Sequence, residues 1–507
     1  MRGFAKVRAA QPTLLSATIV SVETDLSRGL YSFSMVGLPD KAVEEARDRV
    51  SAAIKHAGFD SPKSQNHKVT ISLAPAELKK EGAYFDLPIA LSYLLAADAV
   101  SFDPSNKLFA GELSLDGNLR PVRGILSIAR KAKEMGIAEL YVPEENAAEA
   151  ALINELSVFP VTSLMQLVEH LKTDTPPTLL PTPRTPFAPT PTEGAFDFKD
   201  VRGHETAKRG LEIAAAGRHN IVLYGPPGTG KTFLASAFPG ILPPLSFDEA
   251  IEATAIHSVS GSLNGRTLIE HPPFRSPHHT SSYVALVGGG QIPRPGEVTL
   301  AHKGVLFLDE FPEFDRRAID ALREPLENRV VSVSRAKGSV SFPADFILVA
   351  ALNPSRGHNP DETYQTEKDR LQLQKKISGP IIDRIDLWIE VPHIAHEKLA
   401  QSSKGVEGSA AVRKRVIAAR THQTARFKNS QRTNAMMGVR DIETLVPLGK
   451  EVAAIITNAA QKLNLSPRAF HRTIKIARTI ADLAHERYVS ENHVLEALSF
   501  RPKNLFE

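Results

Sequence analysis

Apolar and polar residues alternate with two different periods in the N-terminal part of the chain. Ser16–Val22 and Lys68–Leu73 alternate with a period of two and are rich in β-branched residues, which predicts strands. Asp40–Ala57 repeats its apolar positions at helical spacing, with Asp40 as an N-cap, and this predicts an amphipathic helix. We expect the apolar run Leu87–Val100 to be a buried core helix, because crossing a bilayer takes about 20 residues.

A proline-rich stretch, Thr173–Thr192, divides the chain. It holds seven of the 36 prolines. Proline lacks a backbone donor and restricts its neighbour to extended geometry, so this stretch predicts a semi-rigid linker. The resulting α/β fold has an N-terminal domain at 1–172, a linker at 173–197, a core with a parallel sheet at 198–392 and a helical C-terminal domain at 393–507.

The strongest motif follows an apolar strand that begins at Ile221. Eight residues match the pattern G-x-x-x-x-G-K-[ST] of a phosphate-binding loop: Gly225, Pro226, Pro227, Gly228, Thr229, Gly230, Lys231 and Thr232. Glycines let backbone N–H groups turn towards phosphates, and the following helix presents its positive end to them. We expect Lys231 to reach the β- and γ-phosphates of ATP and the Thr232 hydroxyl to bind Mg²⁺.

Two more apolar strands end in polar residues. Gly304–Leu308 is followed by Asp309, expected to hold Mg²⁺ mainly through water, and by Glu310, expected to polarise the attacking water. Phe346–Leu352 is followed by Asn353, which can hydrogen-bond both the γ-phosphate and that water. Strands this apolar are central in a parallel sheet, so their tips should emerge beside the phosphate loop. ATP and Mg²⁺ are therefore the predicted cofactors.

This order of motifs resembles that of the AAA+ ATPases, and the surrounding phrases are similar to the magnesium-chelatase-like branch. Those phrases are Phe198–Glu205, Ala207–Gly217, Pro273–Thr280, Gly288–Gly296 and Ser378–Leu387. Together with the part before the linker, they resemble the ComM (YifB-like) family of bacterial competence helicases over nearly the whole chain. The resemblance implies an ATP-driven DNA helicase or translocase that promotes branch migration and the integration of single-stranded DNA during natural transformation.

The same resemblance implies further site residues and partners. Arg384 matches the arginine finger, which reaches the γ-phosphate in a neighbouring subunit. Arg468 matches the sensor arginine of the helical lid, with Arg472 as the alternative. A finger that acts on a neighbour requires a ring, and the family implies a homo-hexamer. The implied partners are single- and double-stranded DNA and recombination proteins, in the cytoplasm and without a membrane.

Two alternating segments around a glycine turn, Val330–Ser334 and Ser339–Phe342, predict a hairpin. In AAA+ rings of this branch such a hairpin points into the pore. Arg335 and Lys337 at its tip would then contact a DNA backbone with little sequence preference. Arg294, in a glycine-rich phrase upstream, is a second candidate for DNA contact.

The N-terminal part resembles the Lon protease domain, but both catalytic positions differ. The position of the nucleophilic serine falls on Asp86, and that of the lysine at about Leu126. A Ser–Lys dyad needs a hydroxyl to attack and an amine to take its proton. We therefore expect a Lon-like α/β fold without the dyad, in a structural or binding role.

Composition and charge limit the alternatives. A net charge of +4 over 507 residues is a weak global field, and the absence of cysteine fits a reducing compartment and excludes thiolate metal sites. The segment Lys398–Arg440 holds ten Lys or Arg and one acidic residue, and is either a phosphate-contacting segment or a basic connector without a ligand. The alternative function is a magnesium-chelatase-type motor acting on a protein partner.

Overall fold

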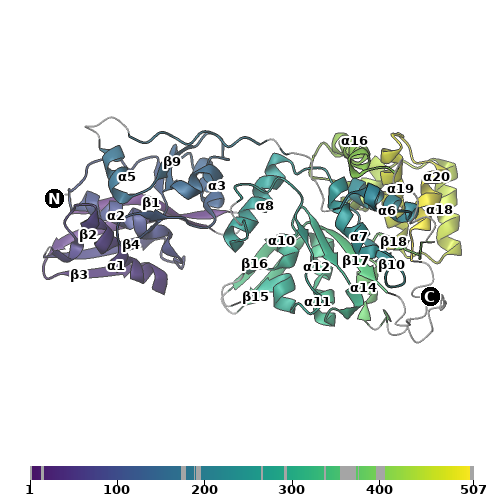
Figure 1. Cartoon of the computed structure of the whole chain (residues 1–507), viewed down its shortest axis with the longest axis horizontal. Helices are drawn as coiled ribbons and strands as arrows, with labels where there is room; N and C mark the ends of the chain where they lie inside the picture. Colours follow the sequence, from purple (N-terminus) through teal and green to yellow (C-terminus); the bar gives the residue numbers. More distant parts are fainter. Residues whose placement is uncertain are drawn as a thin grey trace. The chain divides into compact units, whose positions relative to one another are not determined.

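The computed structural model describes most of the chain (Figure 1). The described residues are 3–12, 16–64, 66–172, 178–187, 189, 196–263, 266–290, 294–335, 338–353, 373–374, 376–394 and 406–502. Their contacts divide the chain into two compact units, one of Met1–Ala188 with Ala250–Ile269 and one of Pro189–Glu249 with Glu270–Glu507. The segment Ala250–Ile269 thus packs with N-terminal residues, whereas the sequence pattern placed it in the second α/β domain. The domain boundaries themselves stay a prediction.

A mixed sheet with the strand order β1-β2-β4-β3 forms one layer of the N-terminal unit. Its strands are β1 (Phe4–Pro12), β2 (Ala17–Arg28), β3 (Ser32–Val36) and β4 (His67–Ala74). The pairs β1–β2 and β2–β4 are antiparallel, and β3 runs parallel to β4. Burial alternates along β2 and β4, so the two strands predicted from a period of two are confirmed.

Two helices complete the core on this sheet. α1 (Lys41–His56) begins where predicted, since the Asp40 carboxylate accepts a hydrogen bond from the Val43 N–H at 2.9 Å. α2 (Asp86–Ala96) packs on β1 and β2 and is buried along its whole length. The predicted buried helix is therefore confirmed, but it ends at Ala96 and not at Val100. The chain turns there, with Asp98 in the left-handed region at φ 62°.

A smaller parallel sheet with the order β5-β8-β9 lies in the same unit. Its strands and a separate short hairpin are β5 (Lys107–Phe109), β8 (Glu139–Pro143), β9 (Ser157–Val161), β6 (Glu112–Leu113) and β7 (Leu119–Arg120). The surrounding helices and 3-10 turns are α3 (Ile125–Glu134), α4 (Glu144–Ala150), α5 (Leu164–Leu171), η1 (Pro62–Ser64) and η2 (Ala83–Phe85). Phe109, Tyr141 and Phe159 stack across the three strands, with ring centroids 5.1 and 4.9 Å apart.

The end of α8 (Phe247–Ser260) is fixed within this unit by a buried carboxylate. The Ser258 hydroxyl donates to Glu149 at 2.7 Å and accepts from the Gly124 N–H at 2.8 Å. Burial raises the pKa of Glu149. A polar group this deep is stable only when it is hydrogen-bonded, and Ser258 supplies one of its donors.

The described part of the proline-rich stretch has no helix or strand, as predicted, but it is not a free spacer. The Thr182 N–H donates to the Val158 carbonyl at 2.7 Å, and the Thr185 hydroxyl donates to the Ala148 carbonyl at 2.7 Å. These bonds attach residues 178–187 to β9 and α4 of the N-terminal unit. The linker at 173–197 itself stays a prediction.

The second unit is built on a wholly parallel sheet with the order β11-β14-β17-β10-β18 (Figure 1). Its strands are β10 (Ile221–Tyr224), β11 (Phe274–Arg275), β14 (Val305–Leu308), β17 (Ile347–Leu352) and β18 (Leu387–Glu390). Every residue of β10, β14 and β17 is buried, which explains their continuous apolar sequences. Because β17 lies between β10 and β14, the carboxyl ends of these three strands meet at one edge.

Helices and short hairpins surround this sheet. The helices and 3-10 turns are α6 (Glu205–Gly217), α7 (Lys231–Ala237), α9 (Tyr283–Val287), α10 (Glu297–Leu300), α11 (Arg316–Ala321), α12 (Arg323–Asn328), α14 (Gly379–Ile382), η3 (Phe198–Asp200), η4 (Phe238–Ile241) and η5 (Phe311–Glu313). The antiparallel hairpins are β12 (Gly288–Gly289) with β13 (Arg294–Pro295) and β15 (Val330–Arg335) with β16 (Gly338–Pro343). The second of these confirms the predicted hairpin.

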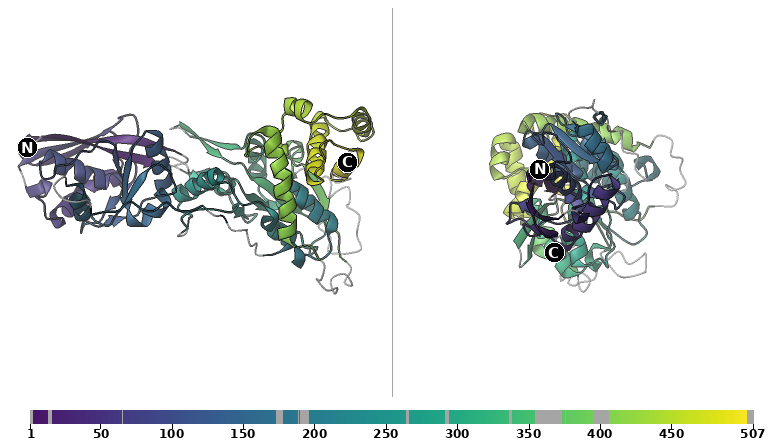
Figure 2. Two further views of the ribbon diagram at one scale, coloured as in Figure 1. Left: turned by 90° about the horizontal axis from the view of Figure 1, so that it is seen from above. Right: turned by 90° about the vertical axis from the view of Figure 1, so that its left-hand side faces the viewer.

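The C-terminal residues are helical, as predicted. The elements are α16 (Ser409–Phe427), η6 (Asn434–Met436), α17 (Val439–Leu445), α18 (Lys450–Lys462), α19 (Pro467–Leu483) and α20 (Glu491–Ser499). α16 and α19 pack against each other and against α6 (Figures 1 and 2). Their apolar faces join the core of the second unit, which holds the parallel sheet and this helical region together.

Most arginines of the basic segment Lys398–Arg440 are bound within the unit. The contacts are Arg413 to the Gly240 carbonyl, Arg415 to Glu212 and Glu407, Arg420 to the Ala215 carbonyl, Arg426 to Asp482, and Arg432 to Asp441. For the described residues 406–440, the alternative of a connector without a ligand is therefore wrong, whereas contacts with phosphates stay a prediction. These charges bind backbone carbonyls and carboxylates of the fold.

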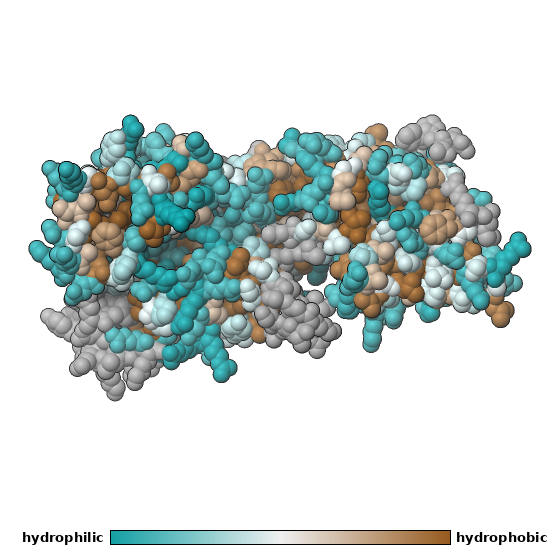
Figure 3. Space-filling model, turned by 180° about the vertical axis from the view of Figure 1, so that it is seen from behind, coloured by the Kyte–Doolittle hydropathy of each residue, from teal (hydrophilic) through white to brown (hydrophobic). Residues whose placement is uncertain are grey.

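Among the residues that the structure describes, no helix is both long enough and apolar enough to span a bilayer. Hydrophilic and hydrophobic residues are interspersed on the face shown in Figure 3.

Candidate nucleotide-binding and hydrolysis site

The phosphate loop connects β10 to α7, as the sequence predicts. Gly225, Gly228 and Gly230 all have positive φ, at 157°, 78° and 88°. A Cβ on Gly225 would lie 2.2 Å from the Val391 carbonyl oxygen, so only glycine fits there. The remaining residues of the motif, Pro226, Pro227 and Thr229, close the turn, and the Thr229 hydroxyl donates to the Pro226 carbonyl at 3.0 Å.

Lys231, the first residue of α7, points back into this loop. Its ammonium donates to the carbonyl oxygens of Gly225 at 2.8 Å and Pro226 at 2.6 Å. Burial lowers its pKa to about 8. The ammonium thus lies among neutral acceptors that anionic phosphates can replace.

The predicted metal ligands lie together. The Thr232 hydroxyl donates to Asp309 Oδ2 at 2.8 Å, across the 77 residues that separate them. Asp309 follows β14 directly, and its other oxygen accepts from the Glu310 N–H at 2.9 Å. A hydroxyl and a carboxylate at the edge of a phosphate loop are oxygen ligands of the kind that Mg²⁺ takes alongside phosphates. Thr232 and Asp309 therefore fit that ion.

Glu310 has a partner that the sequence analysis missed. Its carboxylate contacts His279 Nδ1 at 2.9 Å, and its own backbone lies in the left-handed region at φ 49°. His279 comes from the loop after β11, and β11 pairs with β14, whose end carries Glu310. The sequence Ser276-Pro-His-His279 after a short strand could have pointed to this histidine, but the pattern alone gives it no role. The structure thus places an imidazole against the expected general base.

Asn353 lies at the same edge of the sheet as the phosphate loop. It follows β17, in which Leu352 is opposite Tyr224 of β10. The Gly225 N–H, the first of the loop, donates to the Leu352 carbonyl at 3.3 Å. Asn353 is exposed there, one residue beyond the buried strand.

A cavity of about 610 Å³ adjoins the phosphate loop. It is lined by Asp200, Val201, Arg202, His204, Gly228, Thr229, Gly230, Phe233, His393 and Ile394. His204 is hydrogen-bonded to the backbone of Thr229, and burial lowers its pKa. The apolar and aromatic members, next to the loop glycines, suit a nucleoside base and sugar.

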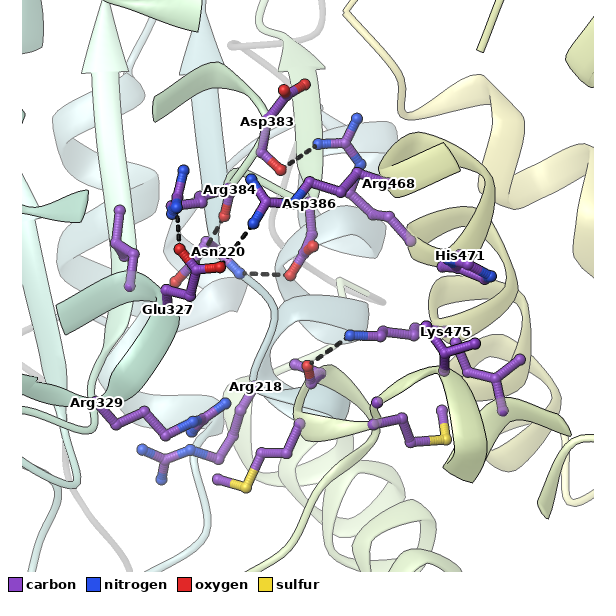
Figure 4. Close-up of a pocket in the computed structure, with 18 of the residues that line it drawn as sticks. Arg218, Asn220, Glu327, Arg329, Asp383, Arg384, Asp386, Arg468, His471 and Lys475 are labelled. Carbon is purple, nitrogen blue, oxygen red and sulfur yellow. Dashed lines mark hydrogen bonds and ion pairs between the residues drawn. The ribbon is translucent and has the colours of Figure 1, made fainter. Parts of the chain in front are cut away.

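Arg384 and Arg468 lie in a different cavity, of about 490 Å³ (Figure 4). Both contact one carboxylate: Arg468 donates to Glu327 Oε1 at 2.6 Å, and Arg384 pairs with Oε2. Arg472 instead donates to backbone carbonyls beside Arg384, including that of Ile385 at 2.7 Å. Among the described residues that line this cavity, none belongs to the phosphate loop.

Comparison with known proteins identifies the family. Residues 197–399 match the model "Magnesium chelatase, subunit ChlI", 22–146 match "Subunit ChlI of Mg-chelatase", and 406–501 match "Magnesium chelatase, subunit ChlI C-terminal". The chain is 43% identical to the uncharacterized protein YifB of Salmonella typhimurium and 41% identical to the competence protein ComM of Haemophilus influenzae. In both cases the similarity covers 96% of this chain and 95% of the relative.

The chain belongs to the ComM (YifB-like) family of magnesium-chelatase-type AAA+ proteins. A weaker similarity, 25% over 202 residues, joins it to the DNA replication licensing factor mcm2 of Xenopus tropicalis and covers 37% of this chain and 20% of that protein. The α/β core, the parallel sheet and the helical C-terminal region are those of an AAA+ protein. The expected fold class and family are therefore confirmed.

In this ComM-family chain, the two described residues expected to contact DNA lie on the two hairpins. Arg335 ends β15, opposite Gly338 of β16, so the backbone places it at the tip. Lys337 lies outside the described residues. Arg294 begins β13 and is exposed. Arg335 thus lies on the hairpin as expected, whereas the position of Arg294 on a hairpin was not expected. The DNA contacts of all three residues stay a prediction.

In the part of the ComM-family chain expected to resemble the Lon domain, an ion pair occupies the position expected for the serine nucleophile. Asp86 is fully buried, pairs with Arg49 Nε at 2.7 Å and accepts from the Leu113 N–H at 3.2 Å. Burial raises the pKa of Asp86, and the pair with Arg49 opposes that shift. At the lysine position, Leu126 offers only its backbone N–H, which donates to Glu149. Neither position has the chemistry of a Ser–Lys dyad.

Proposed function

We propose that this chain is one subunit of an ATP-driven ring that moves along DNA. One observation carries the proposal. The phosphate loop, Asp309 and Glu310 form one site, whereas Arg384 and Arg468 lie in a cavity to which that loop contributes no described residue. Phosphoryl transfer is accelerated greatly by an arginine supplied from outside the phosphate loop. A neighbouring copy supplies it here, and a closed ring gives every subunit such a neighbour.

Within one site the roles follow from the contacts. Lys231 leaves the carbonyls of Gly225 and Pro226 for the β- and γ-phosphates of ATP. Thr232 and Asp309 hold Mg²⁺, which neutralises charge on the phosphate oxygens when bound. Glu310 takes a proton from the attacking water, and Asn353 orients that water against the γ-phosphate.

His279 controls the direction of the Glu310 carboxylate in this proposal. The contact at 2.9 Å occupies one carboxylate oxygen of the general base. A water that attacks the γ-phosphate needs that carboxylate turned towards it. His279 is thus a positioning residue, set on the loop after β11.

Several findings support DNA as the polymer along which the ring moves. The ComM relative is named as a competence protein, and the weaker relative as a DNA replication licensing factor. The hairpin of β15 and β16 carries Arg335 at its tip and leads to β17, which Asn353 follows directly. We propose a homo-hexamer that promotes branch migration and integration of single-stranded DNA in the cytoplasm, with recombination proteins as partners.

The second candidate is a magnesium-chelatase-type motor that acts on a protein partner. The three family models, which all carry the ChlI name, favour it. In that case ATP hydrolysis would depend on a protein and not on nucleic acid.

The test is ATP hydrolysis by the full chain with and without single-stranded, double-stranded and forked DNA. Lys231→Ala is the inactive control, and the mass of the assembly is measured with and without ATP. Stimulation by DNA together with strand separation of the fork supports the proposal. Hydrolysis that no DNA form stimulates favours the chelatase-type motor, and no hydrolysis in the wild type contradicts both.

A further inference from the structure

Glu327 contacts two of the arginines that line the second cavity, Arg384 and Arg468 (Figure 4). Its two carboxylate oxygens are divided between them, Oε1 with Arg468 and Oε2 with Arg384. Arg384 also donates to the Pro380 carbonyl of α14 at 2.6 Å. The Glu327 side chain is 44% exposed. The Arg384 side chain is 14% exposed. Because the carboxylate itself is open to solvent, its ion pairs are weak, and a stronger anion can replace it.

The helix that carries Glu327 is also joined to the hairpin expected to contact DNA. α12 ends at Asn328, two residues before β15 begins. On this helix the Glu324 carboxylate accepts from the Ser332 hydroxyl at 2.6 Å and from the Ser332 N–H at 3.1 Å. Ser332 is part of β15. A displacement of α12 therefore moves the hairpin.

The same helix contacts the start of α14. Arg323 donates to the Ser378 hydroxyl at 2.9 Å, and Ser378 is the N-cap residue of α14. The loop that follows α14 carries Arg384. α12 is thus bonded to the hairpin through Glu324. Through Arg323 and Glu327 it is also bonded to the start and the end of the segment from Ser378 to Arg384.

We propose that Glu327 is a counter-ion that occupies Arg384 and Arg468 until the γ-phosphate of a neighbouring subunit's nucleotide replaces it, and that the freed α12 then shifts the β15–β16 hairpin. A γ-phosphate offers three charged oxygens and accepts from two guanidinium groups at once. The inference rests on the proposed function, because it requires a nucleotide in the adjacent subunit. Coupling of this kind is reciprocal, so DNA on the hairpin displaces α12 and releases the arginines.

The main test is Glu327→Gln in the full chain, which keeps the size of the side chain and removes its charge. With no competing carboxylate, the arginines are available to the neighbour at all times. We expect ATP hydrolysis without DNA to rise about 3–10-fold, and the subunit concentration giving half-maximal activity to fall by a similar factor. The stimulation by DNA should drop towards 1-fold, because its effect on the arginines has already occurred.

Glu407→Gln is the matched control. Glu407 is 48% exposed and pairs with an arginine of the same unit, Arg415, and neither residue lines either cavity. Its hydrolysis rate and DNA stimulation should stay within about twofold of the wild type. Thermal unfolding of both variants confirms that neither change disturbs folding. In an Arg384→Ala background, Glu327→Gln should have little further effect.

The outcomes separate this inference from the proposed function. A fall in hydrolysis like that of Arg384→Ala would mean that Glu327 only holds the finger in place, and the counter-ion idea would be wrong. Unchanged hydrolysis, concentration dependence and DNA stimulation would also contradict it. The proposed function is tested on the wild type alone. If DNA does not stimulate the wild type, the half-maximal subunit concentration of the variant still decides whether Glu327 restrains the two arginines.

Discussion

Raising the pH should weaken ATP binding, because Lys231 loses its proton more readily than an ordinary lysine. Burial among the loop carbonyls lowers its pKa to about 8, from an ordinary value of 10.5. Phosphates next to the ammonium favour the charged form and return the pKa at least to its ordinary value. The pKa of Lys231 is therefore higher in the bound state than in the free state.

The sign and size of the effect follow from this difference. Below pH 8 the ammonium is charged in both states, so the dissociation constant is flat. Above pH 8 the free protein must take up a proton to bind, so the constant rises about tenfold per pH unit until the bound form also titrates. Between pH 7 and pH 9.5 we expect about a 30-fold weakening, which corresponds to about 2 kcal/mol.

The assay is equilibrium titration with a fluorescent ATP analogue at constant ionic strength and Mg²⁺ concentration. Glu310→Gln is the background, so that hydrolysis does not distort the curves. Lys231→Arg is the control, since a guanidinium stays charged over this range and should give a nearly flat profile. A flat profile for Lys231 itself, or the same slope in both proteins, would refute the role of its proton.

The other predictions concern hydrolysis and movement. Glu310→Gln should bind ATP and assemble, but a single-turnover assay should show hydrolysis at least about 100-fold slower. His279→Ala should change kcat and leave the affinity for ATP nearly unchanged. Arg384→Ala should lower the rate of ATP hydrolysis about 1,000-fold, and mixing it with wild-type subunits should partly restore the rate. Activity that is simply proportional to the wild-type fraction at every mixing ratio would argue against action on a neighbouring subunit. Changing Arg335 and Lys337 together to Ala should leave hydrolysis without DNA within a few-fold of the wild type, and should abolish its stimulation by DNA. The change should also reduce the salt dependence of DNA binding. Normal unwinding of a forked duplex would exclude the hairpin as the DNA contact.

The nucleotide site could be predicted because its residues are placed by the strands that precede them. Asp309, Glu310 and Asn353 each follow an apolar run, and the carboxyl ends of neighbouring parallel strands must meet at one edge. The glycine pattern from Gly225 to Thr232 determines the loop between them. The contact between Thr232 and Asp309 therefore follows from the geometry of the sheet, and the sequence alone is enough to predict that geometry.

Contacts between loops could not be predicted in this way. His279 reaches Glu310 only because β11 is paired next to β14, and a strand of two residues gives little periodic signal. The attachment of Thr182 and Thr185 to the N-terminal unit depends on free carbonyls of other elements. Proline content predicts that a stretch lacks helix and strand, but it does not predict what the stretch binds.

The lid arginines show how structure separates residues that the sequence leaves equivalent. Arg468 and Arg472 lie four residues apart on α19, one turn apart on the same face, and both suit a sensor role by position alone. Arg472 donates to the carbonyls of the segment that carries Arg384, so withdrawing it would remove the donor that these carbonyls share. Arg468 is bound to the carboxylate of Glu327. An incoming phosphate is a stronger partner for the guanidinium group and can displace this carboxylate. These contacts favour Arg468 as the arginine that responds to nucleotide, and Arg472 as the one that fixes the finger segment against the lid.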